Sequence, residues 1–258
     1  VEDLAGANRA AVRAVADRAQ QLERGRRDPF QGPLAVRGGV AGHRNTPASA
    51  GRAGGIAAHP GSAVFSVLPT LLSALKLYFP KIRGVLSEVL ENKLFESLQN
   101  YQVDVGFVRE PIPDKYLNSR LIFEECFSLV VPPNHPLTKE NFTGLRQVQN
   151  ESFILPPRHA GSTYHDILLR MCEREGFLPN IIHESNFGTT ILKLVEHNLG
   201  VSLLPSSYRI SSPVNVRFID LDQLPERTQL SMVWRKDDTN PILHNFLDTA
   251  SSVDFRYD

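Results

Sequence analysis

The 258-residue sequence lacks the features that assign a chain quickly to several large classes of protein. Its two cysteines, Cys126 and Cys172, have no metal-ligand spacing and form no disulfide framework, which is typical of a reducing compartment. No apolar run approaches the roughly 18 residues of a membrane span, and the N-terminus has no apolar signal-peptide region. Basic and acidic residues number 28 each, so nucleic-acid binding would need a local basic patch. These absences predict a soluble, cytoplasmic protein.

Catalytic and cofactor-binding patterns are missing as well. The sequence shows no nucleophile–base pair, no phosphate-binding glycine loop and no metal-ligand cluster. His135 lies in an Asn-His-Pro-Leu turn, where a structural role is expected, and no carboxylate is placed to orient His183 or His197. We therefore expect neither an enzyme nor a bound cofactor or metal ion.

Composition divides the chain near residue 62. Before that point there is no lysine, and alanine, glycine and arginine dominate. Residues 7–24 predict a helix that Gly25 ends. The segment that follows has little periodicity, and only residues 33–40 resemble a strand.

From residue 64 onward, helical and strand patterns alternate along the chain. Thr163 stands where the helix 164–175 begins, with Asp166 three residues later, a carboxylate variant of the capping box. Such alternation predicts an α/β architecture with largely parallel sheets. The predicted helices are 65–79, 92–100, 164–175, 189–198 and 241–251, and the predicted strands are 81–89, 103–108, 127–133, 153–157, 181–185, 200–205, 214–219 and 230–234.

Five stretches in this alternating part resemble one family, the LysR-type transcriptional regulators of bacteria. They occur in the family's order and spacing, and together they cover residues 62–251. The stretches are FSVLPTLLSALKLYFPKI, SLQNYQVDVGFV, FSLVVPPNHPL, LVEHNLGVSLLPSS and LSMVWRKDDTNPILHNFLDT.

The resemblance implies a fold like that of the type II periplasmic binding proteins. Two Rossmann-like α/β subdomains would be joined by two crossover strands, with a small molecule bound between them. The first crossing would fall near residues 124–127 and the return near 221–227. Subdomain I would comprise 62–125 plus 226–258, and subdomain II would comprise 126–225.

The N-terminal part departs from the family pattern. Members begin with a winged helix-turn-helix and a dimerising linker helix, but residues 1–61 lack the apolar pattern of a helix-turn-helix. The helix 7–24 resembles the end of the linker helix, and residues 31–42 resemble the first strand of the effector domain. About twenty further residues then precede Gly61. We favour truncation or disruption of the gene product, by a frameshift for example, over a true insertion.

Arg109 is the leading candidate for a ligand contact. It follows the apolar strand 103–108, and its planar guanidinium suits a carboxylate bidentately. The resemblance implies that an arginine after this strand contacts the effector carboxylate in regulators that respond to intermediates of aromatic catabolism. The alternatives are a solvated loop arginine or a salt bridge to Glu110 or Asp114.

The other candidates lie at helix N-termini and strand ends, where unpaired N–H groups favour anions. Each could instead cap a helix, pack in the core or lie in solvent at the surface. They are Ser62, Arg158, Ser162, Thr163, Phe187, Thr189, Thr190 and Pro205.

The function predicted from the resemblance is effector sensing in a LysR-type regulator. A small, anionic or aromatic metabolite would bind between the subdomains, and a homodimer or homotetramer would pass the change to DNA-binding domains. DNA would be bound only through the winged helix-turn-helix that this chain is expected to lack. The alternative is a transport-type solute-binding protein with the same fold, which would need export. An enzyme with an α/β binding fold is a third possibility.

Overall fold

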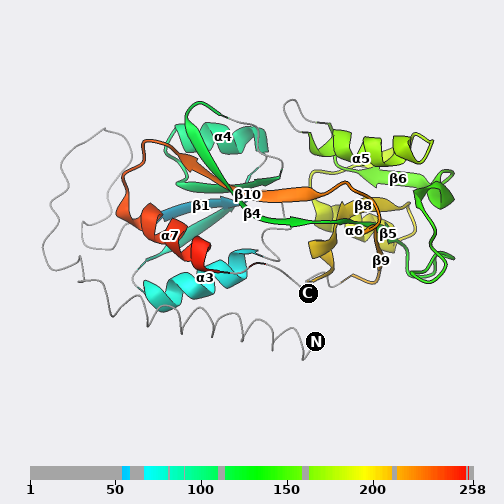
Figure 1. The fold of residues 1–258 in the computed structure, drawn as a ribbon, viewed down its shortest axis with the longest axis horizontal. Helices are drawn as coiled ribbons and strands as arrows, with labels where there is room; N and C mark the ends of the chain where they lie inside the picture. The colour runs from blue at the N-terminus through cyan, green and yellow to red at the C-terminus, as the bar shows by residue number, and fades with distance from the viewer. Residues whose placement is uncertain are drawn as a thin grey trace, which may run out of the picture.

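The computed structural model describes residues 54–58, 67–80, 82–89, 91–109, 114–158, 163–210, 214–253 and 255. They form two α/β subdomains that lie end to end along the long axis of the molecule (Figure 1). The predicted helix 7–24, the predicted strand 33–40 and the candidates Ser62 and Ser162 lie outside the described residues.

Subdomain I is built on a five-stranded sheet with the order β2-β1-β3-β10-β4. Strand β10 is antiparallel to both of its neighbours, whereas β1 is parallel to β2 and β3. The elements of this subdomain are β1 (Gly54–Ala58), α3 (Val67–Tyr78), β2 (Gly84–Glu88), α4 (Glu91–Gln99), β3 (Val105–Arg109), β4 (Leu117–Glu125), β10 (Thr228–Arg235) and α7 (Pro241–Ser252).

Subdomain II contains a three-stranded sheet, β8-β5-β9, and a two-stranded sheet, β6-β7. A parallel bridge between Phe153 and Val201 joins the two sheets. The elements are β5 (Phe127–Val131), the 3₁₀ helix η1 (Leu145–Val148), β6 (Ser152–Leu155), α5 (Tyr164–Arg174), β7 (Asn180–Glu184), α6 (Gly188–Glu196), β8 (Ser202–Pro205), the 3₁₀ helix η2 (Ser206–Arg209) and β9 (Arg217–Asp220).

The helix and strand predictions from residue 67 onward are confirmed, but the expectation of largely parallel sheets is wrong. Three of the described strand pairings are parallel and four are antiparallel. The antiparallel pairings all involve β5 or β10. Each of these strands follows a crossing from one subdomain to the other, so no βαβ unit dictates its direction.

Two strands were missed in the sequence. Strand β1 lies within the segment that we interpreted as lacking any periodic element, because Gly-Gly-Ile-Ala-Ala is too short and too small to show a pattern. It nevertheless lies between β2 and β3, so subdomain I begins before residue 62. Strand β4 was missed because its side chains are largely polar and only partly buried at the sheet edge.

Helices cover both faces of the first sheet and divide its core in two. Helices α3 and α7 pack on one face with Phe107, and α4 packs on the other with Val108. All five residues of β3 are therefore buried, as expected of a strand covered on both sides. Gly106 is required because an added Cβ would lie 2.7 Å from the Cδ atoms of Leu94 on α4.

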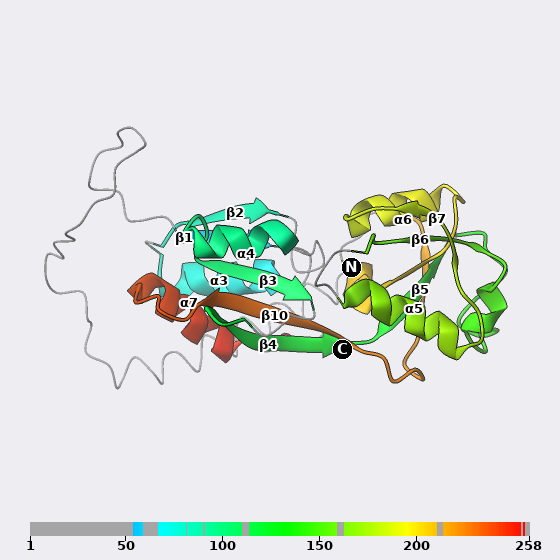
Figure 2. The ribbon, with the colours of Figure 1, turned by 90° about the horizontal axis from the view of Figure 1, so that it is seen from above.

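The chain passes between the subdomains twice. Cys126 alone separates β4 from β5, and residues 221–227 connect β9 back to β10. Figure 2 shows both connections side by side, with β3 pointing toward the second subdomain. Within the described part of the chain, every helix is too short or too polar to span a bilayer.

Candidate functional site

Glu125 is the last residue of β4, and its carboxylate connects the two subdomains. From subdomain I, Nη2 of Arg109 donates to Oε1 at 2.6 Å. From subdomain II, the backbone N–H of Ser207 donates to Oε2 at 2.6 Å and the Ser207 hydroxyl donates to Oε1 at 2.9 Å. The hydroxyl of Ser206 adds a further bond to Oε2 at 3.0 Å. One carboxylate therefore accepts four hydrogen bonds from two subdomains.

The Arg109 side chain is held on the subdomain I side of this junction. It is buried, and its Nη1 donates to the hydroxyl of Thr228, the first residue of β10, at 3.2 Å. The guanidinium also lies 5.9 Å from the centre of the Phe123 ring, within the range of a cation–π contact. Arg109 thus pairs with Glu125, an ion pair that we did not anticipate when we considered Glu110 and Asp114 as partners.

Burial makes this ion pair costly to break. The Arg109 and Glu125 side chains are 5% and 8% exposed. Taking either charge out of water costs several kcal/mol, and removing one partner of such a pair leaves the other uncompensated. The hydroxyls of Ser206, Ser207 and Thr228 offset part of that cost by forming further hydrogen bonds with the carboxylate and with Nη1 of the guanidinium.

The N-terminus of α6 lies next to this junction. Tyr208 follows Ser207 in η2 and is packed so closely on Gly188 that an added Cβ there would lie 2.3 Å from the Tyr208 ring. Gly188 is the first residue of α6. Around it are the candidates Phe187, Thr189 and Thr190, all of which are exposed. Pro205, by contrast, is buried at the end of β8, directly before the two serines.

The N-terminus of α5 reaches the same crossing from another direction. Tyr164 packs on Phe127, the first residue of β5, with ring centres 5.9 Å apart. Arg158 is 70% exposed and pairs with Asp166 of α5 at 3.1 Å. Thr163 occupies the N-cap position, as predicted, but its side chain makes no capping hydrogen bond, so a complete capping box is absent.

Several of the described candidates, namely Arg109, Pro205 and those at the start of α6, therefore lie near one crossing of the chain. Arg109 and Pro205 are linked through Glu125 and Ser206, and the start of α6 is linked through Tyr208. Sequence reasoning missed Glu125, Ser207 and Thr228. The signal for Glu125 was an acid that closes a strand just where the first crossing was expected.

Cys126, in the crossing itself, is unsuited to act as a nucleophile. Burial, together with a hydrogen bond to Asp222, raises the pKa of its thiol to about 11, so the thiol is protonated at neutral pH. Among the described residues, no group of three or more histidine, cysteine or acidic side chains could hold a metal ion.

Comparison with known proteins identifies the family. The family described as "LysR substrate binding domain" matches residues 56–253, most of the chain. The chain belongs to this LysR family. The match begins within β1, in agreement with the place of that strand in the sheet of subdomain I.

Several transcriptional regulators are similar to this LysR-family chain in sequence. The HTH-type transcriptional regulator AlsR of Bacillus subtilis is 26% identical over 72% of this chain and 62% of its own length. The HTH-type transcriptional regulator CatR of Pseudomonas putida is 28% identical over 72% of this chain and 64% of its own length. The chain thus spans less than two thirds of these regulators.

Solved structures of LysR-family proteins share the fold. The match to the structure of the BenM effector binding domain with its effector benzoate covers 79% of this chain and 92% of that domain. Its TM-score is 0.67 and the sequences are 23% identical. The match to the structure of CbnR, a LysR family transcriptional regulator, covers 76% of this chain and 68% of the CbnR chain. Its TM-score is 0.68 and the sequences are 21% identical. The two-subdomain, type II periplasmic-binding-protein-like fold is therefore that of this chain.

Proposed function

We propose that the chain is the effector-sensing portion of a LysR-type transcriptional regulator. The observation that carries this proposal is the family match over residues 56–253 in a two-subdomain fold whose only described connections are two short segments. A fold joined in this way has two subdomains whose relative angle a ligand between them can bias.

The effector we propose is a small carboxylate, aromatic or otherwise, bound at the junction around Glu125. Support comes from Thr189, Thr190 and Phe187, which are exposed residues on either side of Gly188 and offer donors and an apolar ring near Tyr208. Ser62, Arg158, Ser162 and Thr163 stay candidate contacts at other loops and helix starts. BenM, whose fold is similar, has benzoate as its effector.

Arg109 is proposed to contact the effector carboxylate by sharing its guanidinium between the ligand and Glu125. A guanidinium has five donors, so it can hold two anions at once. The effector would then favour the arrangement of the subdomains in which Arg109 reaches it. The effector can shift the equilibrium between two arrangements only by the difference between its affinities for them.

Calorimetry with a panel of carboxylates, beginning with benzoate, tests the effector class. Because removing Arg109 alone strands Glu125, the informative comparison is Glu125→Gln against Glu125→Gln combined with Arg109→Gln. We expect the double variant to bind the best ligand about tenfold or more weakly, the loss of a charge-assisted hydrogen bond. Equal affinity in the two variants would assign Arg109 to structure alone.

The relatives favour regulation over the alternatives. AlsR and CatR are transcriptional regulators, which supports neither a transport-type solute-binding protein nor an enzyme. We propose a cytoplasmic location, and we propose that DNA is bound only through a winged helix-turn-helix, a motif that we do not recognise in the sequence of residues 1–61. Sequence-specific binding of this chain to an operator would contradict our interpretation that residues 1–61 lack that motif.

We propose self-association, as a dimer or tetramer, through the exposed strands β2 and β7. Each lies at the edge of its sheet, and both run along the upper side of Figure 2. Val85 and Leu86 are each more than half exposed, and Ile182 is 44% exposed. Unpaired edges with apolar side chains favour pairing with another chain.

Light scattering tests that interface. We expect Leu86→Lys to shift the protein toward the monomer. Leu121→Lys is the matched control, because Leu121 is equally exposed on the opposite edge strand, β4. An unchanged mass for Leu86→Lys would place the interface elsewhere.

A further inference from the structure

A cavity of about 260 Å³ lies within subdomain I, between the C-terminal half of α3, the N-terminal half of α7 and the start of β2. It is separate from the junction residues, none of which lines it. Its volume is just below the roughly 300–1,000 Å³ of drug-sized ligand pockets, which suits a molecule with one ring or a short chain.

The walls of the cavity are mainly apolar. Leu75, Leu243 and Phe246 belong to the buried core, whereas Leu72 and Ile82 are only partly buried and border the open space. Partly buried aliphatic side chains around an open volume gain free energy when an apolar ligand covers them. The cavity therefore favours a ligand with an apolar body.

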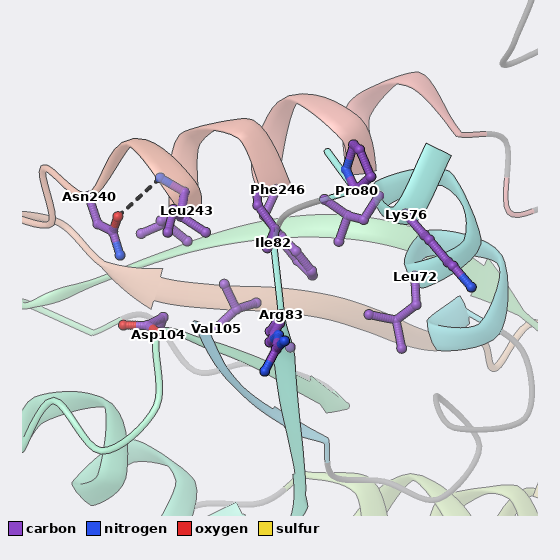
Figure 3. Close-up of a pocket in the computed structure, with 13 residues that line it drawn as sticks. Leu72, Lys76, Pro80, Ile82, Arg83, Asp104, Val105, Asn240, Leu243 and Phe246 are labelled. Atoms are coloured by element: carbon purple, nitrogen blue, oxygen red, sulfur yellow. Dashed lines mark hydrogen bonds between the residues drawn. The ribbon is translucent and has the colours of Figure 1, made fainter. Parts of the chain in front are cut away.

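Two cations border the cavity, Lys76 on α3 and Arg83 just before β2. Both are exposed, and neither forms an ion pair with another described residue. The acid among the lining residues is Asp104, which lies at the opposite end from Lys76 in Figure 3 and pairs with Arg235 at 3.1 Å. The charge left available at the cavity is therefore positive.

We propose that this cavity binds a small monocarboxylate with an apolar body. The carboxylate would lie on the Lys76 and Arg83 side, and the body would lie against Leu243 and Phe246. The side chain of Asn240, at another edge of the cavity, caps α7, because its Oδ1 accepts from the backbone N–H of Ile242 (Figure 3). Selection for a charged ligand over a neutral one would come from the two cations.

Hexanoate and 1-hexanol are the probes that test this proposal, because they share an apolar chain and differ in charge. Methyl NMR of the full chain would follow Ile82 and Leu243 at the cavity and Ile191 in subdomain II as a reference. We expect saturable shifts of the first two methyl groups with hexanoate and weaker binding of hexanol. Shifts confined to Ile191, or equal affinity for both probes, would overturn the proposal.

Two variants sharpen the test. Lys76→Gln with Arg83→Gln should weaken hexanoate binding about three- to tenfold and leave hexanol binding unchanged, as expected when exposed ion pairs are lost. Lys93→Gln, an exposed lysine on α4, is the matched control and should bind hexanoate like the parent. Leu72→Trp should fill the cavity and abolish the binding of both hexanoate and hexanol. If that variant misfolds, the charge variants alone test the proposal. Unaltered hexanoate binding in the charge double variant would refute the role of the cations.

Discussion

Subdomain I holds two buried arginines at opposite ends of the same pair of strands, and their surroundings differ. Arg109 ends β3 and Arg235 ends the antiparallel neighbour β10, so the two face opposite ends of the sheet. Each is 4% exposed. Arg109 faces subdomain II and pairs with Glu125, whereas Arg235 faces away from it.

Arg235 is bound entirely within subdomain I. It donates to the carbonyl oxygens of Leu98 and Val103, and it pairs with Asp104 and Asp238. Through these bonds Arg235 holds the end of α4 and the loop that leads into β3 in place. Arginine thus has two roles here. Arg235 stabilises subdomain I alone, whereas Arg109 helps to connect the two subdomains through Glu125.

Loss of Arg235 should have the largest effect on stability. Arg235→Ala would leave two carboxylates and two carbonyls without their shared donor, and we expect a loss of about 3–5 kcal/mol in the free energy of unfolding. Urea denaturation measures it. A loss below about 1 kcal/mol would show that the distal arginine is dispensable and would remove the contrast with Arg109.

Neutralising Glu125 should have a smaller and more local effect. Glu125→Gln keeps an acceptor but removes the charge opposite Arg109 and two of the charge-assisted bonds, at a cost of about 1.5–3 kcal/mol. Hydrogen exchange at the Ser207 amide should speed up, while amides of α4 should not change. Equal acceleration in both places would indicate that Glu125 supports subdomain I as a whole.

Gly188→Ala tests whether α6 is tied to the junction through Tyr208. The added Cβ would overlap the Tyr208 ring, so the ring would have to move. We expect this displacement to lower the free energy of unfolding by about 1–3 kcal/mol. Combining it with Tyr208→Leu should recover part of the loss. If the double variant is less stable than the sum of the single changes, the contact is not the cause.

Alkaline pH should weaken both the junction and the core of subdomain II, because each contains a buried cysteine. Burial raises the pKa of Cys126 to about 11 and that of Cys172 to about 12, from 9.0 in the unfolded chain. The unfolded state therefore loses these protons first, and the free energy of unfolding should fall as the pH rises from about 9 to 12. Urea denaturation across this pH range measures the effect. In Cys172→Ala the free energy of unfolding should fall less steeply with pH, and an unchanged slope would show that the Cys172 thiol is not responsible.

Much of the fold could be predicted because each element carries its own pattern. Helix α5 was recognised from the capping pattern at its start, and strand β3 was recognised from its continuous apolar run. Strand β1 could not be found this way, because its glycines and alanines owe their strand conformation to pairing with β2 and β3. Its identity as a strand is a property of the sheet.

The candidate site was predicted less completely than the fold. Arg109 stands out in the sequence, since an arginine follows an apolar strand, but its partner is 16 positions away, at the end of the strand β4 that the sequence did not reveal. Ser207 is a further 82 positions from Glu125. No local pattern predicts hydrogen bonds between such distant residues.

The sequence by itself determined most of the elements, their order and the family, because helical and strand periodicities and the spacing of motifs are local properties of the chain. Only the tertiary structure decided that Glu125 holds Arg109 and η2 together, that β5 and β10 run antiparallel to their neighbours, and that α3 and α7 leave a cavity between them. These features depend on which distant segments pack side by side. Such packing is set by the burial of whole faces of helices and sheets, and single stretches of sequence do not encode it.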